Sequence, residues 1–173
     1  AWADLSSSQK RLDLIERANL SDLEAITQIY NDYILERSAT ADMQPVSTKE
    51  REPWFNAHGG SRPIFIYKEN DEILGYCSLS DFNPKIAYDI SVEISIYVAK
   101  KALKKGIGKQ LLAHSLNEAR GLNLKNVIAL IFSKNEASLG LFLKFGFEKW
   151  GELPGVCLMD GEYKDVVILG LKL

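Results

Sequence analysis

The segment of residues 91–109, SVEISIYVAKKALKKGIGK, constrains the fold more than any other part of this 173-residue chain. It begins with strict alternation, in which the apolar residues at 92, 94, 96 and 98 share one face of an extended strand and polar residues share the other. A lysine-rich turn follows, and Gly106-Ile107-Gly108 then opens a helical pattern with apolar residues along one side. The segment therefore predicts a strand, a basic glycine turn and a helix, in that order.

The start of this helix is suited to an anion. The first N–H groups of a helix lack intrahelical acceptors and lie at the positive end of its dipole, and glycine lets a bulky group approach them. Lysines stand at 100, 101, 104 and 105, and Lys109 lies one turn into the helix. A phosphate site and a solvated basic turn both fit this pattern, because glycine pairs are common at helix starts.

The length favours one domain with a single large core. We expect residues 1–11 to be a flexible arm or a cloning remnant, and residues 12–173 to form the domain. The net charge of −2 argues against a nucleic-acid surface, because such surfaces carry a basic excess. There is no run of eighteen apolar residues and no charged-then-apolar leader, so we expect no membrane span, no secretion signal and a cytoplasmic location.

The chain has only two cysteines and two histidines, which limits the scope for disulfides, cysteine nucleophiles and metal sites. Cys77 and Cys157 are far apart in the sequence and make no disulfide framework, so we expect both to be reduced. A Cys-His nucleophilic pair stays open, but nothing beside Cys77 activates it, and a buried strand residue is the favoured interpretation. No spacing of Cys and His supports a metal site, so no metal is expected.

The remaining chain alternates helical and strand patterns, which predicts an α/β fold with a mixed sheet. Two Ser-x-x-Glu capping boxes place helix starts near residues 22 and 48. The expected helices are 22–35, 49–57, the one that follows Gly108, and 135–145. The expected strands are 12–17, 63–68, 73–80, 91–98, 126–132, 147–150 and 165–171, with GELPGVC and MDGEY as turns near the end.

Glu93 is the candidate for chemistry in the key strand. Most strand glutamates face water, but this one shares its face with Ser91, Ser95 and Tyr97, a few residues before the glycine turn. A cofactor bound at the helix start would extend back along the strand, where backbone groups of residues 96–98 could pair with an amide-bearing arm. The Glu93 carboxylate would then face the reacting end as a general base, directly or through a water.

Six segments, in order, resemble the GCN5-related N-acetyltransferase superfamily, and more closely its phosphinothricin acetyltransferase branch. They are LIERANLSDLEAITQIYNDYI, IYKENDEILGYCSLSDF, AYDISVEISIYV, KKGIGKQLL, KNEASLGLFLKFGF and DGEYKDVVIL. The resemblance implies a single-domain fold with a mixed, mostly antiparallel sheet flanked by helices. It also implies transfer of the acetyl group of acetyl-CoA to the α-amino group of a small amino acid analogue, such as phosphinothricin, methionine sulfoximine or methionine sulfone.

The resemblance assigns roles to individual residues as well. The glycine turn would hold the pyrophosphate of acetyl-CoA, and the preceding strand would pair with its pantetheine. The matching residues are Ile96, Tyr97, Val98, Lys104, Lys105, Gly106, Ile107, Gly108 and Lys109. Asn135 matches a cofactor-contacting asparagine in an N-x-x-S motif, and it is also a candidate N-cap of the following helix. Glu93 would help to remove a proton from the substrate ammonium before the amine attacks the thioester.

Two departures from the family pattern bear on activity. Leu103 stands at the first position of the Gln/Arg-x-x-Gly-x-Gly turn, and Phe142 stands where relatives have a histidine or tyrosine that serves as base or general acid. Phenylalanine cannot transfer a proton. The chain must therefore rely on Glu93 with water, or on another group such as Tyr97 or Tyr33.

Substrate contacts are expected in the irregular segment before the key strand. An amino acid analogue carries a carboxylate and a polar or anionic tail, so a cation and oriented amides should lie near it. Lys85 is the candidate cation, although an exposed loop lysine is an equally good interpretation, and relatives tend to have arginine near Asn83. The predicted substrate-binding residues are Asn83, Lys85, Ile86, Ala87 and Tyr33.

Three other functions stay open: acetylation of a protein N-terminus or lysine, non-catalytic binding of acyl-CoA, and nucleotide binding. The first would need an open groove, and the second would lack turnover. The third is disfavoured because neither G-x-x-x-x-G-K-[ST] nor G-x-G-x-x-G is present. The resemblance implies a homodimer that takes a small-molecule amine, and we expect neither nucleic acid nor membrane as a partner.

Overall fold

A computed structural model describes residues 14–173, so the expected N-terminal arm and the first residues of the strand expected at 12–17 lie outside the described residues. The strands are β1 (Ile15–Arg17), β2 (Ile64–Glu69), β3 (Glu72–Asp81), β4 (Ser91–Val98), β5 (Asn126–Phe132), β6 (Glu148–Met159) and β7 (Glu162–Lys172). The α-helices are α2 (Leu23–Glu36), α3 (Thr48–Asn56), α4 (Ile107–Gly121) and α5 (Glu136–Lys144). The four predicted helices are confirmed, with small shifts at their ends.

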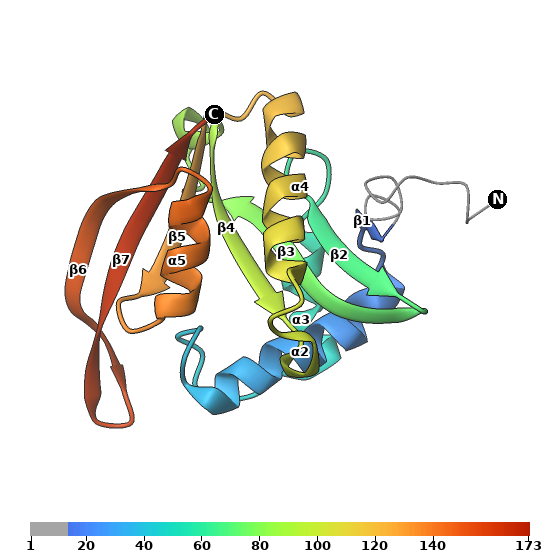
Figure 1. The fold of residues 1–173 in the computed structure, drawn as a ribbon, viewed down its shortest axis with the longest axis horizontal. Coiled ribbons are helices and arrows are strands. Elements are labelled where there is room, and N and C mark those ends of the chain that lie inside the picture. The colour runs from blue at the N-terminus through green and yellow to red at the C-terminus, as the bar shows by residue number, and fades with distance from the viewer. Residues whose placement is uncertain (1–13) are drawn as a thin grey trace.

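Seven strands form one sheet in the order β1-β2-β3-β4-β5-β7-β6 (Figure 1). Neighbouring strands run antiparallel except for β4 and β5, which run parallel. The sheet is therefore mixed and mostly antiparallel, which confirms the predicted fold class.

The last two strands are longer than predicted. β6 runs through GELPGVC, which we expected to be a turn, and only two residues of MDGEY lie between β6 and β7. The pairing with β7 shifts register between Lys149 and Gly151 and again between Leu153 and Cys157. The turn prediction was wrong because proline and glycine here occupy irregularities of an edge strand, where they are tolerated.

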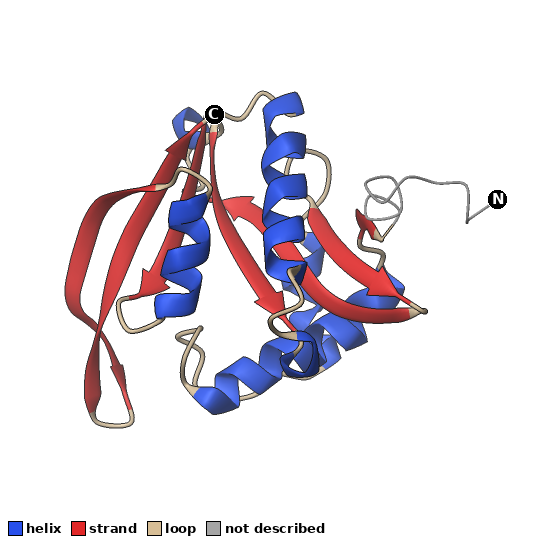
Figure 2. Ribbon diagram, viewed as in Figure 1, coloured by secondary structure: helices blue, strands red, loops and turns tan. Residues whose placement is uncertain are grey.

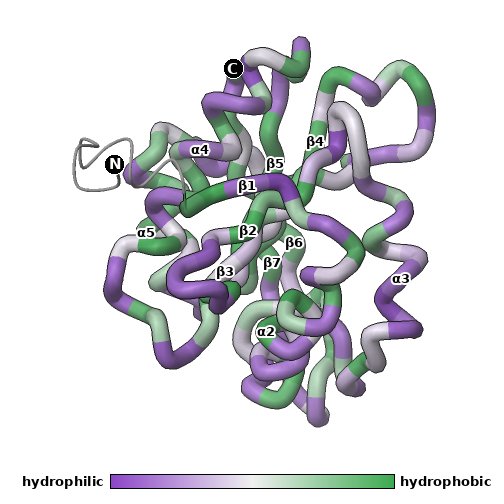
Figure 3. Tube along the Cα trace, turned by 90° about the vertical axis from the view of Figure 1, so that its right-hand side faces the viewer, coloured by the Kyte–Doolittle hydropathy of each residue, from purple (hydrophilic) through white to green (hydrophobic). Residues whose placement is uncertain are grey.

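Helices cover both faces of the sheet. α4 and α5 pack on one face, where the apolar side of β4 is buried against residues such as Leu111 and Phe142. On the other face, residues of α2 pack with Tyr76 of β3, and α3 adds Trp54 and Phe55. Figure 3 shows α3 mainly in hydrophilic colours, and none of its residues is fully buried. The two faces of β4 thus lie in two different environments.

β4 and β5 diverge after a short parallel stretch. They pair only between residues 91–93 and 126–128, whereas β4 stays paired with β3 as far as Val98. The edge of β4 over residues 94–98 therefore has no strand partner on the β5 side. Figure 2 shows the two strands separating along their length.

Gly75 of β3 lets the start of α4 lie against the sheet. A Cβ atom there would lie 3.1 Å from Cδ1 of Leu111, 3.2 Å from Cγ2 of Ile107 and 3.2 Å from the carbonyl oxygen of Tyr97. Because these contacts are too close for packed atoms, Gly75→Val should push α4 away and lower the free energy of unfolding by about 1–3 kcal/mol. Urea unfolding followed by circular dichroism measures the change.

Gly121→Ala is the matched control, because Gly121 ends α4 and a Cβ atom there meets nothing within 4 Å. We expect this variant to be at least as stable as the wild type, since alanine favours a helix over glycine. Equal stability of the two variants would contradict the packing role of Gly75.

Candidate active site

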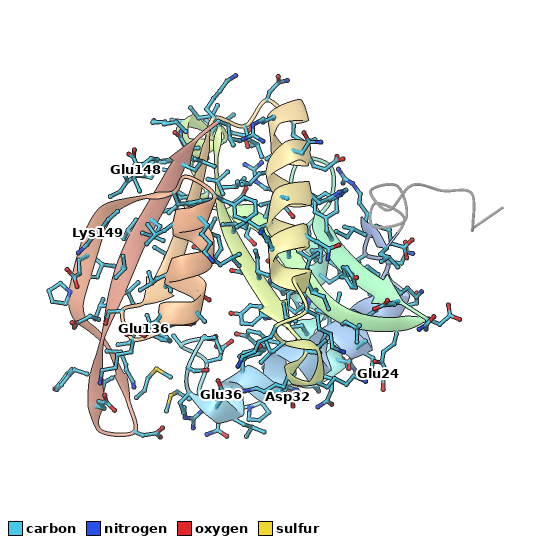
Figure 4. The ribbon with its side chains drawn as sticks, in the orientation of Figure 1. Glu24, Asp32, Glu36, Glu136, Glu148 and Lys149 are labelled. Atoms are coloured by element: carbon cyan, nitrogen blue, oxygen red, sulfur yellow. The ribbon has the colours of Figure 1, made fainter. Side chains whose placement is uncertain are left out.

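A cavity of about 590 Å³ lies where β4 and β5 diverge. Its wall includes residues 96–98 of β4, Phe132 of β5, and the start of α4. Glu36 at the end of α2 and Glu136 at the start of α5 also border it, and both are labelled in Figure 4. A cavity of this size, formed by backbone edges and helix ends, can hold an extended organic molecule.

The basic turn before α4 has the backbone geometry of an anion site. Lys104 and Gly106 adopt left-handed conformations with φ of 63° and 80°, and Gly106 is the N-cap of α4. The Gln110 N–H donates to the Gly106 carbonyl, while the N–H groups of residues 107–109 have no acceptor within the helix. No side chain caps this end of α4. These N–H groups can therefore bind a phosphate at the positive end of the helix dipole.

The lysines around this turn divide into two groups. Lys100 and Lys101 form ion pairs with Glu36 and Glu72. Three others form no ion pair with any residue of the described chain: Lys104, Lys105 and Lys109. Their charge can attract a polyphosphate, which is the electrostatic role that the sequence predicted for the turn.

The open edge of β4 presents backbone groups to the cavity. The Ala99 N–H donates to the Leu74 carbonyl on β3, whereas the Val98 carbonyl accepts from the Tyr33 hydroxyl at 2.5 Å. Because successive residues of a strand direct their backbone groups to opposite sides, the N–H and C=O of Ile96 point to the same open side as those of Val98. These groups can pair with an amide-bearing arm.

The start of α5 forms the opposite wall. Asn135 lines the cavity, and its side-chain oxygen accepts from the Ser138 N–H at 3.2 Å, so its predicted N-cap role is confirmed. Phe142 lines the cavity from within the core, and its ring meets that of Phe147 edge-on at 5.0 Å. An apolar ring, which cannot transfer a proton, thus forms this part of the cavity wall.

Two tyrosine hydroxyls lie on the wall of the cavity. Tyr33 donates to the Val98 carbonyl, and Tyr97 donates to the Ala39 carbonyl at 3.3 Å. Burial raises the pKa of both hydroxyls above the ordinary tyrosine value. Both are therefore protonated at neutral pH and can donate a proton, but neither can act as a base there.

Glu93 lies on the other face of β4, the face that also carries Ser95 and Tyr97, and it does not line the cavity. Its carboxylate is partly buried, and within residues 14–173 it has no ion pair. Burial raises its pKa. Its neighbour across the strands is Ser80, whose hydroxyl lies 2.9 Å from Nε2 of His58. A partly buried carboxylate of raised pKa binds a proton more readily than an exposed one, as a general base requires.

The predicted substrate residues at 83, 85, 86 and 87 lie together on the loop between β3 and β4. None of them lines the cavity, and Ile86 is 90% exposed. Arg62 holds the base of this loop, because its guanidinium pairs with Asp81 at 2.6 Å and with Asp89 at 3.1 Å. The role of Asn83, Lys85, Ile86 and Ala87 in substrate binding stays a prediction.

The structure also bears on the cysteine nucleophile considered from the sequence. Cys77 is fully buried, and burial raises the pKa of its thiol to about 12, so it is not a nucleophile at neutral pH. Cys77 and Cys157 are both free, as expected.

Among residues 14–173, no three His, Cys, Asp or Glu side chains gather as a metal site would require. The helices of the same residues include none that is long and apolar enough to cross a membrane.

Sequence reasoning missed one residue of the α3 helix, Arg51. Its guanidinium carbon lies 3.9 Å from the centroid of the Tyr30 ring and 4.0 Å from that of the Trp54 ring. The spacing of three between Arg51 and Trp54 was the only signal for this contact, since residues three apart share a helix face. The contact with Tyr30 depends on how α2 and α3 pack.

Comparison with known proteins agrees with this geometry. A protein-family model for the acetyltransferase (GNAT) domain matches residues 15–168. YwnH of Bacillus subtilis (strain 168), a candidate phosphinothricin acetyltransferase, is 40% identical over 153 residues, which cover 88% of this chain and 94% of that protein. The L-methionine sulfoximine/L-methionine sulfone acetyltransferase of Pseudomonas paraeruginosa is 35% identical over 161 residues, which cover 92% of this chain and 94% of that protein.

The fold is also that of a solved acetyltransferase. The crystal structure of a GNAT superfamily phosphinothricin acetyltransferase from Sinorhizobium meliloti, in complex with acetyl-CoA, superposes with a TM-score of 0.87. It is 30% identical and covers 92% of this chain and 87% of that one. The chain therefore belongs to the GNAT family and is an acetyl-CoA-dependent N-acetyltransferase.

Proposed function

We propose that this enzyme acetylates the α-amino group of a small amino acid analogue of the phosphinothricin, methionine sulfoximine or methionine sulfone type. The observation that carries the proposal is the position of Glu93 on β4, three residues before the open edge at Ile96. A carboxylate of raised pKa thus stands close to where an acyl group at that edge would lie. The substrates named for the Pseudomonas and Sinorhizobium relatives support the choice of substrate class.

Acetyl-CoA is proposed to lie along the cavity, with its pyrophosphate at the glycine turn and its pantetheine against the open edge of β4. Bound there, it supplies the thioester that the amine attacks. The unpaired N–H groups of residues 107–109 fit the phosphates, and the backbone of Ile96 fits the pantetheine amides. All predicted cofactor residues line the cavity except Lys105 and Lys109, which would act through their charge.

Glu93 is proposed as the general base. Because its side chain does not line the cavity, a water molecule would carry the proton from the substrate ammonium to its carboxylate. The free amine can then attack the thioester. Since Phe142 cannot protonate the leaving thiolate, we assign that step to one of the two hydroxyls on the cavity wall, Tyr33 or Tyr97, which are protonated at neutral pH.

Release of free thiol from acetyl-CoA, followed continuously, tests the proposal. The amines are L-methionine sulfone, L-methionine sulfoximine, phosphinothricin, standard L-amino acids, peptides and polyamines. We expect turnover with the first three and little with peptides. Turnover with peptides alone would favour a protein acetyltransferase, and acetyl-CoA binding without turnover on any amine would favour a non-catalytic module; either result would overturn the proposal.

We also propose a cytoplasmic homodimer, which the resemblance to the family supports. Light scattering coupled to size-exclusion chromatography measures the mass in solution. A mass near the 19.4 kDa of one chain would overturn the dimer.

A further inference from the structure

Arg51 is a cation without an acidic partner. It forms no ion pair within residues 14–173, and its Nε is buried without a hydrogen-bond partner. The buried hydroxyl of Tyr76, a neutral group, interacts with this guanidinium but supplies no negative charge. Partly buried charges in proteins are usually paired, because an unpaired one loses its hydration without compensation. An unpaired guanidinium in this place is therefore suited to an anion from outside the chain.

The position of this guanidinium is well defined. It lies between the rings of Tyr30 and Trp54, which attract a cation to their faces. The Tyr30 hydroxyl bonds to Thr40 and Asp42, and the Trp54 ring packs against His58 with centroids 4.9 Å apart. These contacts fix the positions of both rings. The guanidinium between them is therefore preorganised for a ligand.

Contacts connect Arg51 to the cavity on one side. The Tyr30 ring meets the Tyr97 ring edge-on at 5.4 Å, and Tyr97 lines the cavity. Ser95, the next residue of β4 on this face, lines a second, smaller cavity of about 40 Å³ that shares Tyr97 and Phe142 with the first. The two cavities are therefore adjacent near Tyr97, and Ser95 belongs to the lining of the smaller one.

A second chain of contacts leads from Arg51 to Glu93. The Trp54 ring packs on His58, His58 contacts the Ser80 hydroxyl, and Ser80 stands opposite Glu93. The charge of Arg51 also reaches His58, where it helps to lower the imidazole pKa after the larger effect of burial. Arg51 and Glu93 therefore lie on the same face of the sheet, with Ser95 between Tyr97 and Glu93 along β4.

We propose that Arg51 binds the α-carboxylate of the acceptor amino acid, with its amine directed toward Glu93 and the open edge of β4. This inference rests on the proposed function. The planar guanidinium matches a carboxylate through two parallel hydrogen bonds. A zwitterion bound in this way would have its carboxylate at Arg51 and its ammonium group toward Glu93.

This assignment differs from the expectation that Lys85 supplies the cation. Lys85 lies on the exposed loop, and the Asn83 side chain beside it accepts from the Lys85 backbone N–H. A flexible, hydrated ammonium orients a small substrate less well than a stacked guanidinium does. If Arg51 binds the carboxylate, the loop that carries Lys85 would contact the polar tail of the substrate instead.

The test compares L-methionine sulfone with its carboxamide, which keeps the amine and the sulfone but lacks the negative charge. We expect the wild type to prefer the acid, and Arg51→Gln to lower the acid-to-amide ratio of kcat/KM by about 10- to 30-fold. The loss should lie mainly in the KM of the acid, with the KM of acetyl-CoA unchanged. Because both substrates are measured on one preparation, the ratio does not depend on the fraction of protein that folds.

Two further variants sharpen the result. Arg51→Lys keeps the charge without the planar fork, so it should recover part of the preference. Lys49→Gln removes an exposed cation from the same helix and should leave the ratio unchanged. An unchanged ratio in Arg51→Gln, or an equal loss in Lys49→Gln, overturns the assignment. A wild type that turns over neither substrate overturns the proposed function and this inference with it.

Discussion

Glu93→Gln should lower kcat for acetyl transfer by about 10²–10⁴-fold and leave the affinity for acetyl-CoA nearly unchanged. Glutamine keeps the shape of the side chain but cannot accept a proton from the substrate ammonium, and general-base assistance is worth a factor of this size. Glu93 does not line the cavity proposed for the cofactor, so cofactor binding should not depend on it. Steady-state rates and calorimetric titration with acetyl-CoA measure the two effects separately.

The pH dependence gives a second measure of the same group. Burial raises the pKa of Glu93 above 4.5, the ordinary glutamate value. A base acts only when deprotonated, so kcat should fall as the pH falls through the raised pKa, and this acid limb should lie above pH 4.5. Glu93→Gln should remove the limb.

Glu148→Gln is the matched control. Glu148 is an exposed strand glutamate on β6 that does not line the cavity, and Figure 4 shows it near the edge of the molecule. Its replacement should leave both the rate and the pH profile unchanged. If Glu93→Gln retained the wild-type rate, Glu93 would have no part in the mechanism.

Gly106→Val should raise the KM for acetyl-CoA by about 10- to 100-fold, with a smaller change in kcat at saturation. Gly106 has a φ of 80°, which a β-branched residue adopts only at a cost of about 1–3 kcal/mol. A Cβ atom there would meet only Gln110, at 3.9 Å, so the first atom of the side chain does not clash with the fold. The substitution should therefore distort the backbone of the turn. It should also hinder the approach of a phosphate to the N–H groups of residues 107–109.

Gly140→Ala controls for the loss of a glycine near the cavity. Gly140 lies within α5, where a Cβ atom meets nothing within 4 Å. This variant should bind acetyl-CoA as the wild type does. Wild-type binding by Gly106→Val as well would mean that the phosphates bind elsewhere.

Several local features of this fold could be predicted from the sequence. The capping box of Ser47 and Glu50 forms both of its expected bonds, and Gly106 stands at the start of α4 in a conformation that favours glycine. The alternation in β4 buries Val92 and Ile94 on the expected face. Six family segments in the correct order also predicted the family, which the comparisons confirm.

The sequence misled where local signals and tertiary context disagree. Proline and glycine in GELPGVC are typical of turns, but pairing with β7 keeps this stretch in β6, with irregular register around it. The predicted substrate residues were placed by their closeness to β4 along the chain. The loop that carries four of them lies outside the lining of the cavity, whereas Tyr33 lines it, and the role of all five in substrate binding stays a prediction.

The sequence by itself determined the type and order of the elements, the glycine turn and the two faces of β4. These features depend on residues within one helical turn or one strand, so neighbouring residues are enough to specify them. Only the tertiary structure decided that β4 and β5 diverge after residue 93, that Glu93 is partly buried, and that Arg51 lies between Tyr30 and Trp54. Each of these depends on strand register and on the packing of α2 and α3, which bring together side chains that are distant in the sequence and leave no periodic pattern in it.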